Sequence, residues 1–336
     1  MKILNIMLSR ELGGIQQAFL DYHEALKLEG FEVINVTSIF AKINRLLPLK
    51  HCLLNFGPWD ILSRLHLKLI VLLHRPNLII AHGNRAICFT SRKKSIPVIG
   101  VAHNYKLKDF SKCDYIIALT KHMVEHLIEQ KFRSDRIILI PNMIKLGLEK
   151  TSKDLSIPVK IGTMARFVPK KGIDVFINSL VRLKRQRYEF QVVIGGDGPE
   201  KNNLVKLINT QGLQAEVKFI GWVENKTSFF DNIDIFVLPS LHEPFGIIIL
   251  EAMANGVPVV ATKAEGPAEI IRDPLDGLLC DINSSQDLAK KIAYLIDNPS
   301  LAKRFTHSSY LRLSENYDIK IVSELLSSYL KLIINR

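Results

Sequence analysis

The stretch from residue 233 to residue 262 constrains the fold more than any other part of this chain. Residues 233–238 form a short apolar run typical of a buried strand, and residues 239–246 contain the Pro and Gly residues that end strands. Good helix formers follow, and Asn255-Gly256 is a typical helix stop. The apolar run 257–261 is typical of the next buried strand. The stretch therefore predicts one strand-helix-strand unit of an α/β sheet.

Similar alternation extends along both halves of the chain. With 336 residues, of which 47% are hydrophobic, the chain is long enough for two domains with cores of their own. Residues 145–158 are polar and broken, and we interpret them as a linker between an N-terminal domain, residues 1–150, and a C-terminal domain, residues 151–315. The apolar spacing predicts a last helix near 317–334. Alternating elements of this kind favour parallel βα units. They are predicted at 2–8, 15–29, 31–37, 59–74, 78–82, 97–101, 114–119, 121–131 and 136–140, and then at 159–165, 173–185, 190–195, 200–210, 216–220 and 225–231.

Two carboxylates, Glu243 and Glu251, lie eight residues apart in the first-mentioned unit. Glu243 falls in the loop at the carboxyl end of a strand, where backbone N–H groups and the positive end of a helix dipole can hold a phosphate or a sugar hydroxyl. Glu251 lies within the helix, from where it can reach a second pair of hydroxyls such as those of a ribose. Alternatively, residues 247–249 are a core strand and both glutamates are solvated, but a carboxylate inside an apolar run needs a partner.

These residues resemble a known family. Glu243 and Glu251 match the E-x7-E pattern of the retaining, nucleotide-sugar-dependent glycosyltransferases of family 4, and the Glu-Pro-Phe-Gly, Glu-Ala-Met-Ala and Gly-Val-Pro-Val-Val-Ala segments around them are similar to that family almost residue for residue. The resemblance implies that Glu243 holds sugar hydroxyls and Glu251 the ribose. It also implies that Phe245, Gly246 and Ile247 bind the donor.

The same resemblance implies an α/β fold of the GT-B type. In that fold two doubly wound Rossmann-like domains enclose a cleft, the N-terminal domain lies on the acceptor side, and the C-terminal domain binds the nucleotide sugar. It further implies that a C-terminal helix, here residues 316–336, crosses back to the first domain.

Two cations, Arg166 and Lys171, follow a predicted strand and precede a helix. Fixed cations at such a strand end stabilise the charge that develops on a diphosphate leaving group. The motif resembles the family's Gly-Arg-x-x-x-x-Lys-Gly phosphate clamp, with Ala165 where Gly is usual. The simpler reading, solvated surface charge, suits the neighbouring Lys170 best.

Two glycine pairs follow other strands. Gly196 and Gly198, in Gly-Gly-Asp-Gly-Pro-Glu, permit a tight turn and close approach of a ligand, but alone they are a weak signal. They match the family's Gly-x-Gly-Pro loop, which is expected near the nucleotide base. Gly13 and Gly14 open the first helix, where their amides can approach the donor, and a plain strand-to-helix turn explains them nearly as well.

Histidines follow two strands of the N-terminal half. His103 matches the family's histidine loop, and the resemblance implies that it bonds a donor-sugar hydroxyl or orients the acceptor. His82 stands in a similar position, but a lone histidine at a strand end is more often structural. Glu265 stands where the family usually has glycine in a Gly-Gly-x-x-Glu loop, which leaves the sugar specificity open. The simpler interpretation of Glu269 is a capping or pairing group.

No cofactor and no metal are expected. His122 and His126 fit the His-x-x-Glu-His pattern of inverted zinc peptidases, but no third ligand has a signature and the helix falls within a βα series. The chain has no Asp-x-Asp motif of the kind that holds a donor diphosphate through a cation in the other major transferase fold.

The net charge of +12 calls for an anionic partner. The chain has no nucleic-acid-binding motif, so a nucleotide-sugar donor and a glycan or lipid-linked acceptor at an anionic membrane surface fit better. Residues 41–58, basic and apolar, can rest on such a surface, although an ordinary core with a solvated face is an equal explanation. The scattered cysteines, the lack of a membrane-spanning segment and the lack of a signal peptide favour the cytoplasm, at the inner face of the membrane.

The sequence thus predicts a metal-independent, retaining glycosyltransferase that moves a sugar from a nucleotide diphosphate, preferably UDP, to a cell-envelope acceptor such as lipopolysaccharide core. Two alternatives stay open. A glycosidase would use two carboxylates, but these must face each other across the bond. An inactive donor-binding subunit of a membrane-associated complex would bind nucleotide without turnover.

Overall fold

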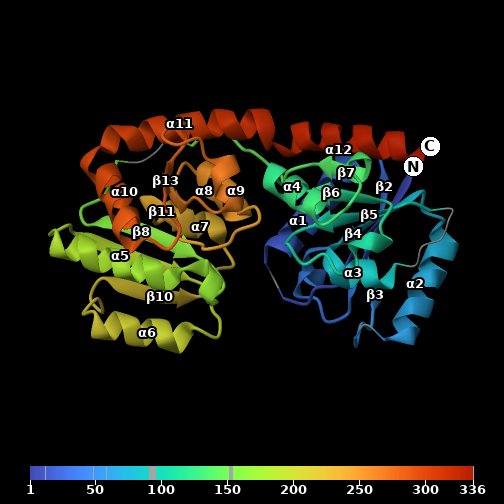
Figure 1. The fold of residues 1–336 in the computed structure, drawn as a ribbon, viewed down its shortest axis with the longest axis horizontal. Helices are drawn as coiled ribbons and strands as arrows, with labels where there is room; N and C mark the ends of the chain where they lie inside the picture. The colour runs from blue at the N-terminus through green and yellow to red at the C-terminus, as the bar shows by residue number, and fades with distance from the viewer. Residues whose placement is uncertain (12, 48, 58, 91–95, 151–153, 336) are drawn as a thin grey trace. The chain divides into compact units, whose positions relative to one another are not determined.

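A computed structural model describes residues 1–11, 13–47, 49–57, 59–90, 96–150 and 154–335. The chain divides into two compact units (Figure 1). The first comprises Met1–Lys145 together with Asn316–Arg336, and the second comprises Leu146–Glu315. Residues 151–153 of the interpreted linker lie outside the described residues. In the described part of the chain, no helix combines the length and the apolar character that a membrane crossing requires.

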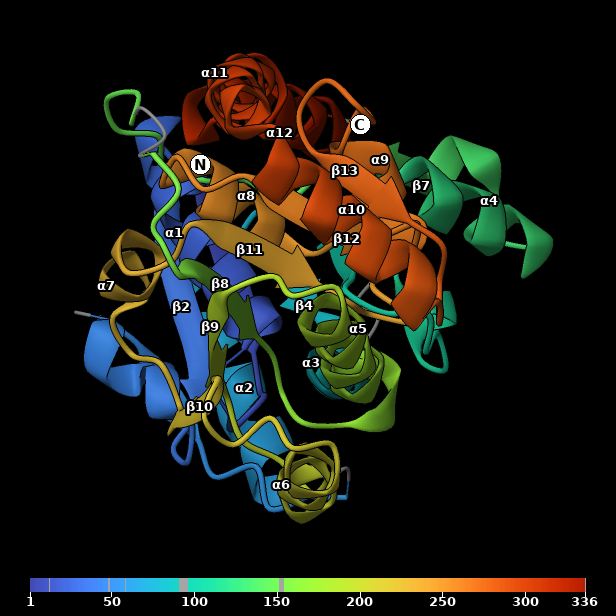
Figure 2. The ribbon, with the colours of Figure 1, turned by 90° about the vertical axis from the view of Figure 1, so that its left-hand side faces the viewer.

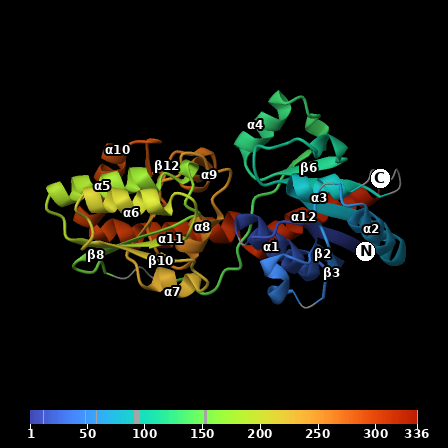
Figure 3. The same cartoon turned by 90° about the horizontal axis from the view of Figure 1, so that it is seen from below.

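The sheet of the first unit is parallel throughout, with strand order β3-β2-β1-β4-β5-β6-β7. Right-handed crossovers that run in opposite directions from β1 put helices on both faces of the sheet. On one face α1 packs beside α12 (Figure 3). The strands are β1 (Lys2–Met7), β2 (Glu32–Ser38), β3 (His51–Leu53), β4 (Leu78–His82), β5 (Val98–Ala102), β6 (Tyr115–Ala118) and β7 (Ile137–Leu139). The helices are α1 (Gly14–Leu28), α2 (Ile61–His74), α3 (Gly83–Phe89), α4 (Lys121–Glu129) and α12 (Ile319–Ile334), with 3₁₀ turns at Lys42–Leu46, Phe110–Lys112 and Ser134–Arg136.

The second unit has a parallel sheet of order β10-β9-β8-β11-β12-β13. Helices α5 and α10 lie side by side on one face of it (Figure 2), and their buried residues form one core cluster with those of α6. The strands are β8 (Val159–Met164), β9 (Phe190–Gly195), β10 (Val217–Gly221), β11 (Ile235–Leu238), β12 (Val259–Thr262) and β13 (Leu278–Cys280). The helices are α5 (Ile173–Arg185), α6 (Lys201–Thr210), α7 (Lys226–Asp231), α8 (Ile247–Ala254), α9 (Glu265–Ile270), α10 (Ser285–Asp297) and α11 (Pro299–Asn316), with a 3₁₀ turn at Pro169–Lys171.

The predicted architecture of two doubly wound parallel sheets is confirmed. Helix starts follow from local capping chemistry: the side chains of Asp60, Thr120 and Ser284 each accept a hydrogen bond from a backbone N–H in the first turn of α2, α4 and α10. Several elements were not anticipated, among them α3, β13, α10 and α11.

The basic-apolar segment 41–58 is part of the first unit rather than a separate appendage. It contains a 3₁₀ turn and the edge strand β3. Ala41, Ile43, Leu47 and Leu53 are buried in the core, while Pro48 and Pro58 lie outside the described residues. Packing therefore explains about half of its apolar residues, while Leu46, Leu49, Leu54 and Phe56 are exposed.

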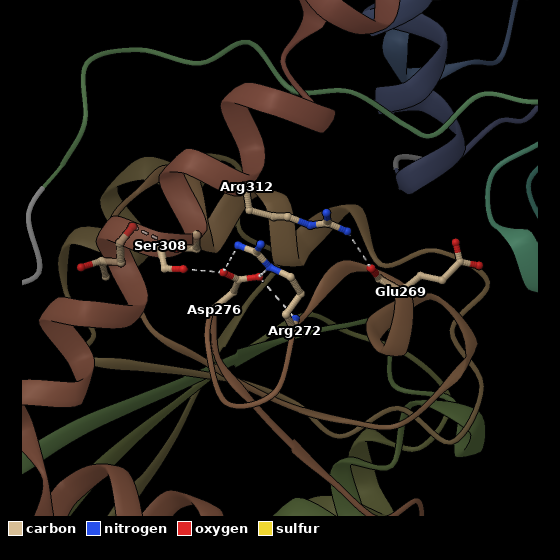
Figure 4. Close-up of polar contacts among 7 residues, drawn as sticks. Glu269, Arg272, Asp276, Ser308 and Arg312 are labelled. Atoms are coloured by element: carbon tan, nitrogen blue, oxygen red, sulfur yellow. Dashed lines mark hydrogen bonds and ion pairs between the residues drawn. The ribbon is translucent and has the colours of Figure 1, made fainter.

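One polar cluster fastens the loop before β13 to helix α11 (Figure 4). The carboxylate of Asp276 has no solvent exposure, and it accepts hydrogen bonds from Arg272 Nε at 2.6 Å, Arg272 Nη2 at 2.8 Å and Ser308 Oγ at 2.7 Å. From the same helix, Arg312 Nη2 donates to the carbonyl of Glu269 at 3.3 Å. The cluster holds the long helix α11 against the rest of the second unit.

Candidate active site

The candidate site begins at the carboxyl edge of the second sheet. In the strand order, β8 and β11 are neighbours, yet the chain leaves β8 in one direction and β11 in the other. Loops that diverge at such a switch point leave a crevice, which is where ligands bind in open α/β sheets. The loops after β8 and β11 carry Arg166, Lys171 and Glu243. Strand order therefore brings together residues that are about seventy positions apart.

Lys171 and Glu243 form a direct ion pair, and both side chains are largely shielded from solvent. Ser240 Oγ donates to the same carboxylate oxygen of Glu243 at 3.2 Å. The sequence analysis treated these two residues as separate elements of the site. Their pairing places a cation and a carboxylate at one point, so a bound ligand must share or replace that contact.

Arg166 is exposed on the loop after β8, and Lys170 is exposed as well. Backbone contacts hold this loop: Lys170 O accepts from Leu241 N at 2.8 Å, which joins it to the loop after β11. Because Lys171 is shielded and paired whereas Lys170 points to solvent, the structure distinguishes the two neighbouring lysines.

The glycine loop after β9 packs directly on the loop that carries Arg166. Phe167 N donates to Asp197 O at 2.9 Å. Gly196 has φ 127°, and a Cβ there would lie 1.9 Å from Ala165 O; a Cβ on Gly198 would lie 2.4 Å from Phe167 O. Both glycines are thus required by the close approach of two loops, whatever else they contact.

Helix α8 starts at the switch point. Gly246, in the left-handed region with φ 92°, precedes its first residue, Ile247, and Phe245 is buried beside it. The positive end of the α8 dipole lies in the same loop as Glu243, and it favours an anion there.

Glu251 lies one turn further along α8, and its side chain is largely buried. Its Oε1 accepts from Lys226 Nζ of α7 at 2.5 Å, while Oε2 is buried with no hydrogen-bond partner among the described residues. Burial raises the pKa of Glu251, and the charge and hydrogen bond of Lys226 oppose that shift. A buried acceptor without a partner is costly, so Oε2 is a contact point for a ligand donor such as a hydroxyl.

Glu265, at the start of α9, supports the loop of Glu243. Its Oε2 accepts from the backbone N–H of Glu243 at 3.0 Å, and its Oε1 lies 3.1 Å from His242 Nδ1. Burial opposes its ionisation, but the hydrogen bonds from His242 and from backbone N–H groups prevail and hold the pKa of Glu265 below its usual range. The charge of Glu265 therefore stabilises the loop that carries Glu243.

The first unit has a switch point of its own, between β1 and β4. Gly13 and Gly14 follow β1 at the start of α1, His82 ends β4, and His103 comes directly after β5. All four predicted residues therefore lie at the carboxyl edge of one sheet, around its switch point.

A chain of hydrogen bonds links the two histidines to Asn5 of β1. Asn5 Nδ2 lies 3.4 Å from the Phe19 carbonyl, which can only accept, so Asn5 Oδ1 faces His82 Nε2 at 2.9 Å and accepts its proton. His82 Nδ1 is then an acceptor, and it lies 3.0 Å from His103 Nε2. His103 must therefore donate from Nε2, which leaves the lone pair on its Nδ1.

Both histidines are neutral in this arrangement. Burial lowers the pKa of His82 well below its usual range, with a further contribution from His103, and burial lowers the pKa of His103 to about 3. The rings of Phe19 and Tyr22 pack perpendicular to that of His82, with centroid separations of 5.5 and 4.9 Å.

The zinc-peptidase pattern does not assemble a metal site. His122 Nδ1 lies 2.8 Å from the Tyr105 hydroxyl, and the His126 ring packs edge-on against the same tyrosine. In the parts of the chain that the structure describes, no three His, Cys, Asp or Glu side chains gather in a way that could hold a metal ion.

Two of the residues described above, and the role of a third, were missed from the sequence. Lys226, the partner of Glu251, and Asn5, the partner of His82, carry no motif, and Glu265 was noted only as a departure from a family pattern. Each acts through a contact with a residue at least 22 positions away. Spacing along the chain contains no signal for such pairs.

Two family models match the chain. The model described as "Glycosyltransferase Family 4" matches residues 12–148, and the model described as "Glycosyl transferases group 1" matches residues 150–312. Among curated proteins, the chain is 28% identical over 284 residues to the lipopolysaccharide core biosynthesis glycosyltransferase LpsE of Rhizobium meliloti, which covers 82% of this chain and 81% of that protein. It is 26% identical over 346 residues to LpsD of the same organism, across 96% of both chains.

Solved structures with the same architecture were also found. HepE of Anabaena, crystallised with UDP and glucose, superposes with a TM-score of 0.85 at 22% identity, across 98% of this chain and 99% of that one. The lipopolysaccharide outer core galactosyltransferase WaaB, in its apo form, gives a TM-score of 0.77 at 17% identity, across 98% of this chain and 100% of that one. At these identities the likeness shows the fold, and it confirms the predicted GT-B type.

Proposed function

Since this chain belongs to the glycosyltransferases of family 4 and group 1, we propose that it transfers a sugar from a UDP-sugar to a cell-envelope glycan, with retention at the anomeric carbon and without a metal. The observation that carries the proposal is the convergence of Lys171, Glu243 and Glu251 at the switch point of the second sheet. Cation, carboxylate and helix N-terminus together suit a sugar joined to a diphosphate.

Glu251 supplies the nucleotide end of this site. Its unpartnered Oε2 accepts from a ribose hydroxyl, and the charge and hydrogen bond of Lys226 oppose the rise in pKa that burial causes. The glycine loop at Gly196 and Gly198 brings backbone rather than side chains towards the base.

Lys171 supplies the phosphate end. When the donor is bound, the ammonium group turns part of its interaction from Glu243 to the diphosphate, and the carboxylate of Glu243 accepts from hydroxyls of the donor sugar. Arg166 and the positive end of α8 add charge stabilisation. The support from Glu265 keeps the Glu243 backbone in place for this exchange.

Retention follows from attack on the face that the leaving group departs from. The bond between the anomeric carbon and the β-phosphate oxygen breaks, the acceptor oxygen forms its bond to the same carbon, and the acceptor proton moves to the departing phosphate oxygen. The protein's own contribution is positioning and charge stabilisation. His103 accepts a hydrogen bond from a sugar hydroxyl at Nδ1, and Gly13 and Gly14 allow close approach of the donor.

The acceptor class is inferred from the relatives. LpsE and LpsD are named for lipopolysaccharide core biosynthesis. A lipid-linked acceptor of that kind is held at the inner face of the cytoplasmic membrane, where this protein would work as a peripheral enzyme. HepE was crystallised with UDP, which favours UDP as the nucleotide.

A donor screen tests the proposal. The purified protein is titrated calorimetrically with a panel of UDP-, GDP- and ADP-sugars, and slow donor hydrolysis and transfer to lipopolysaccharide core acceptors are followed by NMR, with and without EDTA. We expect binding and turnover with a UDP-sugar, an α-linked product from an α-linked donor, and no effect of EDTA. Neither binding nor hydrolysis with any donor contradicts the function. Binding without turnover on any acceptor favours a donor-binding subunit instead, and inversion or EDTA sensitivity contradicts the mechanism.

A further inference from the structure

Helix α2 exposes an unusual amount of apolar surface. Ser63, Leu67, Ile70 and Val71 form its buried side. At 100° per residue, six aliphatic side chains fall on one continuous arc of the opposite side, and each of them is more than half exposed. Trp59, just before the helix, is 91% exposed. The six are Ile61, Leu62, Leu65, Leu69, Leu72 and Leu73.

Cations border this arc, and acids are almost absent from the region. Arg64 and Lys68 lie along one edge of the arc, and Arg75 follows the helix. Of the chain's 45 Lys and Arg residues twelve lie in residues 33–108, against one of its 33 Asp and Glu residues, so this stretch carries +11 of the net +12. The one acid, Asp60, is used as the cap of α2, where it accepts from the backbone N–H groups of Ser63 and Phe56.

We propose that the exposed face of α2, with Trp59 at its start, is an interfacial anchor that docks the first unit on an anionic phospholipid surface. Aliphatic side chains enter the boundary between headgroups and acyl chains, and the bordering cations contact the phosphates. The inference rests on the proposed function in one respect: the anchor would bring the enzyme to a lipid-linked acceptor. It also differs from the sequence expectation, which placed the contact in segment 41–58. That segment exposes Leu46, Leu49, Leu54 and Phe56, whereas α2 presents six aliphatic side chains on one continuous face.

The charge distribution favours a membrane over a second copy of the chain. A two-fold interface that packs α2 antiparallel to its copy would bring Arg64 and Lys68 of one copy close to the same residues of the other, and like charges would repel. A bilayer with anionic headgroups offers the opposite charge next to an apolar phase. The six aliphatic side chains also lack the polar rim of acids and amides that a protein interface would use.

Vesicle binding by the full-length protein tests this anchor. Vesicles of phosphatidylglycerol and phosphatidylcholine are compared with phosphatidylcholine alone, at low and high salt, by co-sedimentation and by the fluorescence of Trp59 in a Trp222→Phe background. The variants are Leu65→Gln/Leu69→Gln and Lys68→Glu. Their matched controls in the second unit are Leu275→Gln/Leu311→Gln and Lys206→Glu, which also replace exposed residues.

We expect salt-sensitive binding to the anionic vesicles, with Trp59 emission at shorter wavelength. Each α2 variant should weaken binding by on the order of tenfold, and the controls should bind like the wild type. Unchanged UDP affinity in the α2 variants would separate the anchor from the donor site. Absence of vesicle binding, equal losses in the controls, or dimerisation that depends on Leu65 in the ultracentrifuge would overturn the anchor, and all three leave the donor chemistry untouched.

Discussion

The two lysines at positions 170 and 171 differ in environment although they are neighbours in sequence. Lys171 is shielded and paired with Glu243, whereas Lys170 is exposed. We expect Lys171→Ala to lower turnover by on the order of 100-fold, since it removes a preorganised cation from the leaving group. Lys170→Ala is the matched control and should change turnover little. Steady-state kinetics with a saturating donor measure both, and equal mild effects would show that the pair is only surface charge.

His103 depends on His82 for its tautomer. We expect ¹⁵N NMR of the wild-type protein to show His103 protonated at Nε2 and bare at Nδ1, because His82 Nδ1 accepts from it. His82→Phe removes that acceptor, so the two tautomers of His103 should mix. The rate constant kcat should fall more than the donor KM rises, since we propose that the donor binds mainly to the second unit. His82→Gln, which retains an acceptor, should recover part of the activity; a single Nε2-protonated form in His82→Phe would contradict the relay.

The neutral histidines also make stability depend on pH. The pKa of His103 is about 3 in the fold, against about 6.5 for an unfolded histidine. Below pH 6.5 the unfolded state therefore binds a proton that the folded state refuses, and the stabilisation present above pH 6.5 is lost as the pH falls towards 3. We expect urea midpoints to fall over this range, and to fall less in a His82→Gln/His103→Gln variant. Parallel curves for the two proteins would contradict the neutral assignment.

At the scale of elements, the contact between Arg272, Asp276 and Ser308 holds α11 on the second unit (Figure 4). Arg272→Met leaves the fully buried Asp276 carboxylate without its cation, which should cost about 3 kcal/mol of unfolding free energy. Adding Asp276→Asn to that variant removes the buried charge and should recover part of the loss. Arg182→Met, which removes an exposed arginine, is the control. Urea unfolding followed through Trp222 in a Trp59→Phe background measures all three, and additive losses in the double variant would contradict the coupling.

Loops, rather than helices, fix the candidate site at this scale. The loops after β8, β9 and β11 contact each other through backbone groups, with Gly196 and Gly198 leaving room for the approach. Sequence motifs marked each of these loops separately. The contacts between them depend on β9, β8 and β11 being consecutive in the sheet, which no single motif encodes.

At the scale of the whole molecule, the chain returns to its first unit through α12. Val322, Leu326 and Leu330 of this helix are buried, and α12 packs beside α1. Leu326→Ala should therefore cost the first unit about 2–5 kcal/mol, while Leu332→Ala, at a position 60% exposed, should cost little. Trp59 and Trp222 report on different units, so urea unfolding in single-tryptophan backgrounds resolves the effect. A loss seen equally at both tryptophans would contradict packing confined to the first unit.

The sequence by itself determined the fold class of both halves of the chain. Apolar runs of strand length, helical spacing and Pro or Gly breakers act over about ten residues, and they sufficed to predict the α/β class, most strands to within two residues, and the helix that carries Glu251. They also placed Glu243, Lys171, Arg166 and His103 after the ends of strands. Helix α3 is only seven residues long and was missed. Helix α10 was missed as well, although Ser284 caps it and its buried Leu288, Ile292 and Leu295 recur at helical spacing.

The tertiary structure alone decided which of these residues meet. The pairing of Lys171 with Glu243, of Lys226 with Glu251 and of Asn5 with His82 requires the strand order of each sheet, and that order is set by packing of the whole unit rather than by neighbouring residues. The sequence likewise left open which apolar residues are exposed. Segment 41–58 buries Ala41, Ile43, Leu47 and Leu53 and exposes its other large apolar residues, while α2 turns six aliphatic side chains outward. Burial depends on what covers a face, and a one-dimensional pattern does not contain that information.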